Sequence, residues 1–251
     1  MNPESLGWSD FFSDQVVQGG IDDRERPSRV TSINRTEVTL HDGVSEFKTT
    51  VGGKWFYNRE DEVPIVGVWV LVDSENKLTR LLRRRNGLKR IHPYKFGKMQ
   101  SMTANLDQLF IVSSCNEDFN ESRIERFLTL AESNNIEPVV VLTKADLTSE
   151  GEYYVSRAQA LTDHRVHLIN AIKTDECEKL LEHLQSGETT SLIGSSGVGK
   201  STIINSLLKE KVQKKKLQKH IQTSGLTMQE GGRVINLCDK GIRKNEKSKL
   251  K

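Results

Sequence analysis

The chain has 251 residues, of which 35% are hydrophobic and 28% are charged, and its formal net charge is +3. This composition is typical of a soluble globular protein. The longest uncharged apolar stretch, Val63 to Val72, is half of the ~20 residues that a membrane-spanning helix needs. The three cysteines are isolated and form no Cys-x-x-Cys pair, so we expect neither a disulfide framework nor a structural zinc cluster.

The start of the chain, Met1-Asn2-Pro3-Glu4, lacks the basic and then apolar regions of a secretory signal. We therefore expect a cytoplasmic protein with no membrane partner. At about 100 to 200 residues per domain, the length predicts two domains that each bury a core of their own.

Basic residues are concentrated in two parts of the chain. Residues 209–251 carry a net charge of +9, and residues 1–208 sum to −6. A second basic run, Lys77 to Lys98, lies in a stretch that contains no acid. Charge of one sign is expected of a surface that binds a phosphate backbone, and a solvated face is the alternative. The residues singled out for RNA binding are Arg83, Arg84, Arg85, Lys89 and Arg90.

Short runs between about Gln15 and Arg85 alternate apolar with polar residues, as in Arg29 to Ile33, Glu37 to Leu40 and Val66 to Val72. This alternation predicts strands, and the turn residues between them favour a small antiparallel barrel. A basic oligonucleotide-binding barrel, placed at residues 1–100, accounts for both the pattern and the charge.

The pattern changes after Leu106 to fully apolar runs that alternate with segments of helical periodicity. Such runs are typical of a parallel sheet covered by helices on both faces, so we expect one α/β domain at residues 101–208. The predicted strands are Leu109–Val112, Pro138–Leu142, His167–Ile169 and Thr190–Ile193, and the predicted helices lie near Ile124–Leu130, Glu152–Leu161 and Asp175–Leu184.

A glycine-rich segment follows the last predicted strand and precedes the apolar helical run Ile203 to Leu208. It fits the pattern GxxxxGK[ST] in its required strand-to-helix setting, where backbone N–H groups and the helix N-terminus surround phosphate oxygens. Lys200 would bridge the β- and γ-phosphates, and the Ser201 hydroxyl would ligate Mg²⁺. The predicted phosphate-binding residues are Gly194, Ser195, Ser196, Gly197, Val198, Gly199, Lys200, Ser201 and Thr202.

The tetrapeptide Thr143-Lys144-Ala145-Asp146 follows directly on a predicted strand, at the edge where α/β sheets bind ligands. A carboxylate at Asp146 can accept the N1 and N2 hydrogens of guanine, and the stem of Lys144 can pack on the base. Adenine cannot satisfy that carboxylate, so ATP would be rejected. The alternative is that Asp146 caps a following helix.

The order of these two motifs is the reverse of that in most GTPases, which indicates circular permutation. Together with Thr103-Ala104-Asn105-Leu106-Asp107, they make the chain resemble the ribosome small subunit-dependent GTPase A family. The resemblance covers roughly residues 1–208. It implies an N-terminal oligonucleotide-binding barrel followed by a circularly permuted P-loop GTPase α/β domain.

The resemblance also implies a monomeric cytoplasmic GTPase that binds GTP or GDP with Mg²⁺ and acts in maturation of the small ribosomal subunit. Its barrel would bind 16S rRNA. Asn170 and Ala171 lie where the family has its base-contacting loop, so the guanine-binding residues that we expect are Thr143, Lys144, Asp146, Asn170 and Ala171.

The chain departs from the family after the P-loop. Its only aspartate there is Asp239, no Asp-x-Pro-Gly occurs, and Val234-Ile235-Asn236 has Asn236 where the family aspartate belongs. With one Cys and one His in this part, the family's zinc domain cannot be built. We therefore expect an incomplete GTPase sheet without its switch strand, followed by a basic, divergent or truncated segment at residues 209–251.

Three functions remain open. The first is a GTPase of small-subunit maturation. The second is an rRNA-binding protein whose site binds GTP without hydrolysing it, because the missing aspartate removes part of the electrostatic stabilisation of phosphoryl transfer. The third is a P-loop ATPase or kinase unrelated to translation, which the resemblance disfavours.

Overall fold

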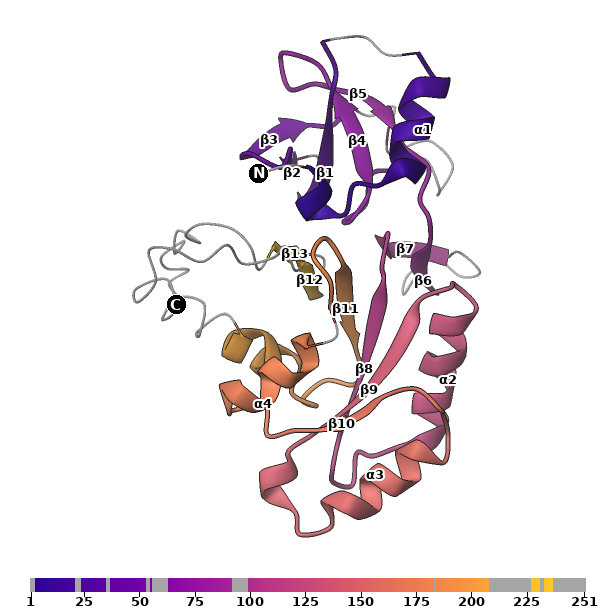
Figure 1. Cartoon of the computed structure of the whole chain (residues 1–251), viewed down its shortest axis with the longest axis vertical. Helices are drawn as coiled ribbons and strands as arrows, with labels where there is room; N and C mark the ends of the chain where they lie inside the picture. Colours follow the sequence, from indigo (N-terminus) through magenta and orange to yellow (C-terminus); the bar gives the residue numbers. More distant parts are fainter. Residues whose placement is uncertain are drawn as a thin grey trace.

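A small antiparallel barrel stands on a parallel sheet flanked by helices (Figure 1). The structure is a computed structural model of the chain. It describes residues 3–20, 24–34, 37–52, 55, 63–91, 99–182, 184–207, 227–230 and 233–236, with no side chains described for 90, 91 and 227–236. None of the described helices is long and apolar enough to cross a membrane.

The barrel is built on one long strand, β1 (Arg26–Asn34), which pairs antiparallel with β4, with β2 and, at Ser32, with β13 (Arg233–Asn236). Arg26 to Arg29 pair with β4 and Arg29 to Asn34 pair with β2, and a bulge interrupts the pairing with β2 between Val30 and Ser32. Bulges bend strands in this way at barrel corners. Alternate residues of these strands form the barrel core, so the predicted antiparallel barrel is confirmed. The other strands are β2 (Glu37–His41), β3 (Glu46–Thr50), β4 (Trp69–Val72) and β5 (Leu78–Leu81).

Two short helices that the sequence analysis did not predict pack against the outside of the barrel. They are η1 (Pro3–Leu6) and α1 (Asp10–Gln18). Phe12 and Leu6 are buried against Trp69, and the rings of Trp8 and Trp69 meet edge to face at 4.8 Å. The N-terminal segment therefore covers the outward face of β4 with aromatic side chains.

A two-stranded hairpin lies between the barrel and the parallel sheet (Figure 1). It consists of β6 (Gly87–Ile91) and β7 (Met99–Ala104). The predicted domain limit at residue 100 falls inside β7. Of the second half of the basic run, Lys89 in β6 is the cation whose side chain the structure describes.

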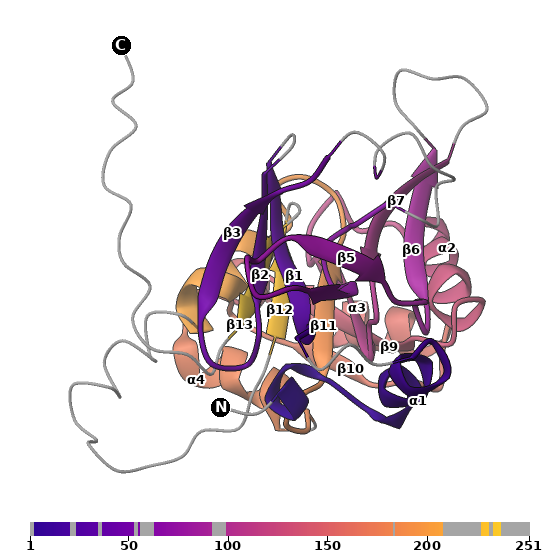
Figure 2. The same cartoon turned by 90° about the horizontal axis from the view of Figure 1, so that it is seen from above.

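The parallel part of the large sheet has the order β10-β9-β8-β11, and all four of these strands are parallel. Helices α2 and α3 lie on one face, and α4 and the helix at residues 200–207 lie on the other (Figures 1 and 2). The strands are β8 (Gln108–Ser114), β9 (Glu137–Thr143), β10 (Val166–Leu168) and β11 (Thr189–Ile193), and the helices are α2 (Glu121–Glu132), α3 (Gly151–Gln159) and α4 (Thr174–Glu178) with the short η4 (Ala145–Leu147) and η5 (Lys179–Leu181).

Alternation along the central strands divides the core in two. In β8, Phe110 and Val112 face the helix at 200–207, whereas Leu109 and Ile111 face α2. Both faces are buried because helices cover both, which is why the middle of β8 and of β9 is a continuous apolar run. The predicted circularly permuted α/β fold is confirmed, although α4 and η5 end earlier than the helix predicted to reach Leu184.

The sheet does not end at the P-loop strand. β12 (Thr227–Glu230) pairs in parallel with β11, and β13 (Arg233–Asn236) pairs antiparallel with β12. The sheet therefore extends two strands beyond the P-loop strand, and neither strand contains the Asp-x-Pro-Gly whose absence led us to expect no switch strand. These four-residue runs are too short and too polar to be recognised as strands in the sequence. The rest of residues 208–251 lies outside the described part of the chain.

A buried arginine joins the barrel to the parallel sheet. Arg29 is 2% exposed, and its guanidinium donates to the carbonyl oxygens of Leu6, Gly67 and Asn105. Burial lowers the pKa of Arg29 to about 10, against the attraction of Asp107, so it stays charged at neutral pH. One side chain thus satisfies acceptors from three segments that are distant in sequence.

The segment that follows continues this junction. The Asn105 amide donates to the Gly67 carbonyl at 2.9 Å, and its oxygen accepts from the Arg85 N–H at 2.8 Å. The Asp107 carboxylate accepts from the Thr189 N–H at 2.7 Å and from the Arg85 guanidinium at 2.8 Å. Asn105 and Asp107 therefore fix the barrel linker to the start of β11.

We predict that Arg29→Met destabilises the protein by roughly 3 kcal/mol, because three buried carbonyls lose their charged donor. The free energy of unfolding from denaturant titration measures the change. Arg157→Met is the control, since Arg157 pairs with Glu121 on the surface and its loss should have little effect. Equal effects of the two substitutions would contradict the role given to Arg29.

Candidate functional site

The glycine-rich segment forms a loop between β11 and the helix at residues 200–207, as predicted. Gly194 has φ +155° and Gly199 has φ +102°. A Cβ at Gly194 would lie 2.2 Å from the Val112 carbonyl oxygen, so only glycine fits there. The Lys200 ammonium donates to the carbonyls of Gly194 and Ser195 at 3.0 and 2.6 Å, which closes the loop on itself.

The tetrapeptide 143–146 follows β9 and contacts this loop directly. The Thr143 hydroxyl lies 2.5 Å from the Val198 carbonyl and 3.3 Å from that of Ser113. Thr143 is fully buried, and a Cβ at Gly199 would touch its side chain at 3.4 Å. The structure therefore places Thr143 against the P-loop, a contact that the sequence analysis did not foresee.

Lys144 and Asp146 lie at the surface beside the P-loop. Lys144 has left-handed backbone (φ +60°), which turns the chain out of β9 into η4. Asp146 is exposed. Neither η4 nor α3, the two helices that follow, has a side-chain cap, so the helix-capping alternative for Asp146 has no support in the described residues.

A third loop, residues 169–173, lies next to this tetrapeptide, because the Ala145 N–H donates to the Ile169 carbonyl at 3.4 Å. The Asn170 N–H donates to Glu176 at 2.6 Å, and this bond, more than the nearby Lys173, holds the pKa of the Glu176 carboxyl below its usual value. Since the Asn170 N–H is engaged, Ala171 is the better candidate to present an N–H to a base.

The P-loop helix holds this third loop in place. The Ser206 hydroxyl donates to the Ala171 carbonyl at 2.7 Å, and the Cys177 thiol lies 3.4 Å from the same oxygen. Both side chains are buried. The sequence offered one signal for Ser206. Ser206 and Leu207 lie three and four residues after Ile203, so the polar Ser206 falls on the apolar face of the helix.

The structure brings the predicted phosphate and guanine residues together at one edge of the sheet, joined by the bonds from Thr143, Ala145 and Ser206. The predicted RNA residues lie elsewhere, before and within β6. Arg83 is exposed, Arg84 donates to the Val63 carbonyl at 2.8 Å, and Arg85 pairs with Asp107. The side chain of Arg90 lies outside the described residues.

Comparison with known proteins gives the family. The family model described as RsgA GTPase matches residues 81–231, which is more than half of the chain. The chain belongs to the RsgA GTPase family. This confirms the resemblance on which the sequence analysis relied.

Relatives and solved structures agree with the assignment. The small ribosomal subunit biogenesis GTPase RsgA 2 of Vibrio vulnificus is 37% identical over 211 residues, which is 83% of this chain and 58% of that protein. The small ribosomal subunit biogenesis GTPase RsgA of Mesorhizobium japonicum is 38% identical over 204 residues, which is 80% of this chain and 57% of that protein. The chain thus spans under three fifths of the length of these curated relatives.

Two crystal structures share the fold. YjeQ from Thermotoga maritima superposes with a TM-score of 0.59 and 25% identity, covering 84% of this chain and 73% of that one. YloQ, described as a circularly permuted GTPase, has a TM-score of 0.55 and 24% identity, covering 85% and 71%.

We predict that Ser206→Ala weakens binding of GDP roughly fivefold, because the buried Ala171 carbonyl loses its donor and the base loop is less well held. It should also narrow the preference for GDP over ADP. Titration with fluorescently labelled nucleotides measures both. Ser156→Ala is the matched control, since that hydroxyl only bonds the Glu152 carbonyl on exposed α3. A loss of thermal stability with unchanged selectivity would refute a positioning role.

Proposed function

We propose that this protein binds GTP at the edge formed by the P-loop, residues 143–146 and residues 169–173, and hydrolyses it while bound to the small ribosomal subunit. The observation that carries the proposal is the Thr143 to Val198 hydrogen bond, which joins the phosphate loop to the base-recognition loop. Loops joined in this way present phosphate and base contacts at a fixed separation, as a nucleoside triphosphate requires.

The base contacts favour guanine. Asp146 is exposed at the site edge and has no role as a helix cap among the described residues, so its carboxylate is available to two N–H donors of one base. The Lys144 stem would cover one face of the ring, and the Ala171 N–H would meet the guanine carbonyl. Adenine offers a single amino donor and would leave the carboxylate incompletely paired.

The residues present fit Mg²⁺ as part of the nucleotide site. Mg²⁺ takes oxygen ligands and keeps several waters, so one or two protein oxygens and the phosphates suffice. Ser201 lies in the first turn of the P-loop helix and is exposed. When bound there, Mg²⁺ neutralises phosphate charge. The Ser201 hydroxyl would be its ligand, and Lys200 would exchange its loop carbonyls for phosphate oxygens.

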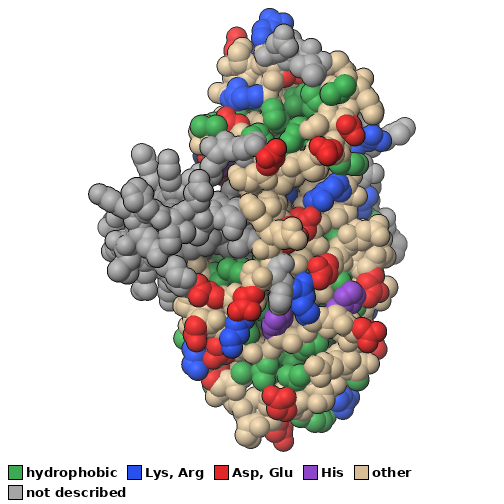
Figure 3. Space-filling model, viewed as in Figure 1, with side chains coloured by type: hydrophobic (Ala, Val, Ile, Leu, Met, Phe, Trp, Pro, Cys, Tyr) green, Lys and Arg blue, Asp and Glu red, His purple; other side chains and the backbone are tan. Residues whose placement is uncertain are grey.

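The barrel and its hairpin support the ribosomal part of the proposal. Arg83, Arg84, Lys89 and Arg90 lie in the acid-free run next to the junction of the two sheets. Figure 3 shows both signs of charge interspersed over one face of the molecule, so that face is not a continuous basic surface. Contact with 16S rRNA is therefore proposed at the hairpin. We propose a cytoplasmic monomer.

A second candidate function is binding of GTP and rRNA without hydrolysis. The observation that favours it is the sequence after the P-loop, which contains no Asp-x-Pro-Gly. Without that aspartate and its backbone, the developing charge on the γ-phosphate has fewer stabilising groups.

We predict that Asp146→Asn lowers GTP affinity roughly 10- to 100-fold, because a carboxylate that accepts two N–H groups is replaced by an amide with a mismatched donor. Xanthosine triphosphate, which has an acceptor where guanine has its amino group, should bind the variant better than GTP does. Competition against labelled GTP measures both affinities. Asp163→Asn, an exposed aspartate outside the site, is the control. Unchanged guanine selectivity would show that Asp146 does not read the base.

Single-turnover hydrolysis with Mg²⁺, with and without small ribosomal subunits, separates the two candidate functions. We expect the subunit to stimulate turnover, and we expect Lys200→Ala to abolish it together with GTP binding. Tight GTP binding with no turnover in either condition would favour the second candidate. Failure of the wild-type chain to bind GTP would overturn both.

A further inference from the structure

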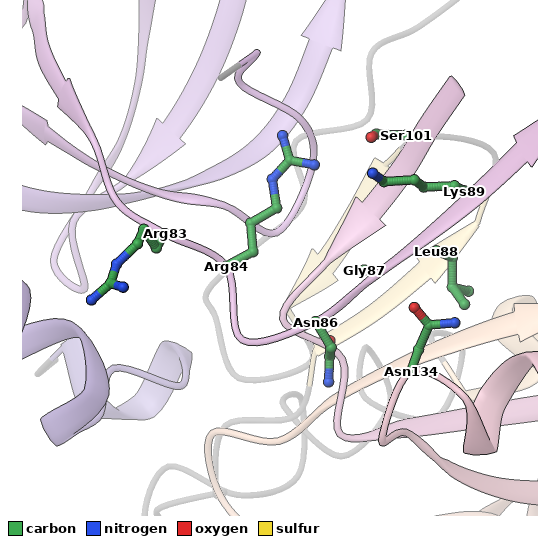
Figure 4. Close-up of a pocket in the computed structure, with 8 residues that line it drawn as sticks. All are labelled: Arg83, Arg84, Asn86, Gly87, Leu88, Lys89, Ser101 and Asn134. Carbon is green, nitrogen blue, oxygen red and sulfur yellow. The ribbon is translucent and has the colours of Figure 1, made fainter. Parts of the chain in front are cut away.

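A pocket of about 330 Å³ opens at the junction of the two sheets, away from the P-loop (Figure 4). Its lining comes from the segment before β6, from the hairpin itself, and from the turn between α2 and β9. Three of its eight lining residues are Lys or Arg, and none of the eight is acidic. The pocket therefore favours an anion.

The cations and a hydroxyl of this pocket face one another. Lys89 of β6 is the direct cross-strand partner of Ser101 of β7, so the two side chains stand on one face of the hairpin. Figure 4 shows Lys89 and Arg84 extending toward each other, whereas Arg83 points away. The Arg84 guanidinium donates to the Val63 carbonyl through Nη2, which holds its position at the rim.

The Ser101 hydroxyl is the observation that points to a ligand. Its oxygen is buried and has no hydrogen-bond partner among the described residues. A buried hydroxyl without a partner is costly, and a bound group that supplies one removes the cost. A phosphate oxygen placed between Lys89 and Ser101 would accept from both.

Asn134 adds an acceptor on the opposite wall. Its amide nitrogen donates to the Leu130 carbonyl at 2.8 Å, so the amide is oriented and its oxygen is the group left for a ligand. Figure 4 shows the side chain pointing toward β6. A phosphodiester has no hydrogen-bond donor for this acceptor, but a ribose 2′-hydroxyl could donate to it.

We propose that this pocket binds one ribose-phosphate unit of single-stranded RNA. Lys89, Arg84 and Ser101 hold the phosphodiester, and the Asn134 oxygen accepts from the 2′-hydroxyl. Arg85, which lies beside the pocket in sequence, takes no part because it is paired with Asp107. The inference deepens the proposed rRNA contact and rests on it only for the identity of the RNA. The site lies at the opposite edge of the parallel sheet from the P-loop, because Asn134 precedes β9 and Thr143 ends it.

The test uses the whole chain and a labelled oligoribonucleotide of about ten nucleotides, with the DNA of the same sequence and inorganic phosphate as comparison probes. Lys89→Ala should weaken RNA binding roughly five- to tenfold and reduce the slope of log affinity against log salt by about 0.7. Asn134→Ala should weaken binding of RNA but not of DNA.

Lys77→Ala is the matched control. It removes another lysine of the same basic run, which does not line the pocket and whose ammonium is paired with Glu75. Equal losses for Lys77→Ala and Lys89→Ala would show diffuse attraction and overturn the site. Equal losses of RNA and DNA affinity in Asn134→Ala would overturn the ribose contact. Binding of phosphate in the pocket with RNA affinity unchanged by Lys89→Ala would show a site for the free anion and refute the proposal.

Nucleotide binding separates this result from the proposed function. Lys200→Ala should still bind RNA with the salt dependence of the wild type, even though it binds no GTP. If the wild-type chain lacks GTP binding but Lys89→Ala and Asn134→Ala behave as described, the pocket stands and the GTPase proposal fails.

Discussion

The hydrogen bond from the Thr143 hydroxyl to the Val198 carbonyl is the contact on which the site depends. It joins two loops that lie in reverse order to that of most GTPases. The bond needs only that β9 and β11 end at the same edge of the sheet, on either side of β8. Since parallel strands end together whatever connects them, circular permutation changes the connections and leaves the contact in place. Gly199 has φ +102°, a backbone conformation that favours glycine, and a Cβ there would reach only ordinary contact with Thr143.

The motif Thr103 to Asp107 has a structural explanation of a different kind. Asn105 adopts a left-handed backbone (φ +57°) and bonds both Gly67 in the barrel and Arg85 before the hairpin. Asp107 bonds the start of β11, five strand residues before the P-loop. Arg29 donates to the Asn105 carbonyl at the same corner, from the face of β1 that carries its pairing with Trp69. A short polar segment thus sets how the barrel stands on the sheet that carries the nucleotide site.

Sequence reasoning succeeded where a local pattern has one structural meaning. The apolar strands β8, β9 and β11 and the glycine-rich loop could be predicted because burial on both faces and phosphate contact each demand a recognisable composition. It failed where tertiary partners decide. Helix α1 packs against Trp69, and β12 pairs with the edge of β11. The Arg85 side chain forms an ion pair with Asp107. In the site, the glycines were predictable, whereas the role of Ser206 required knowing that Ala171 lies against its helix.

The directions of β12 and β13 decide which of their residues lie toward the P-loop, and this bears on the proposed hydrolysis. β12 runs parallel to β11, so its end at Glu230 lies toward the P-loop edge. β13 runs back, and Asn236 pairs with Thr227, which itself pairs with Thr189 at the far edge. The run Val234-Ile235-Asn236 therefore leads away from the phosphates. Asn236 thus lies away from the Mg²⁺ site proposed at Ser201, although the run resembles the family's aspartate strand. For the proposed hydrolysis, a further group that stabilises the charge on the γ-phosphate would come from another part of the chain or from the ribosomal subunit.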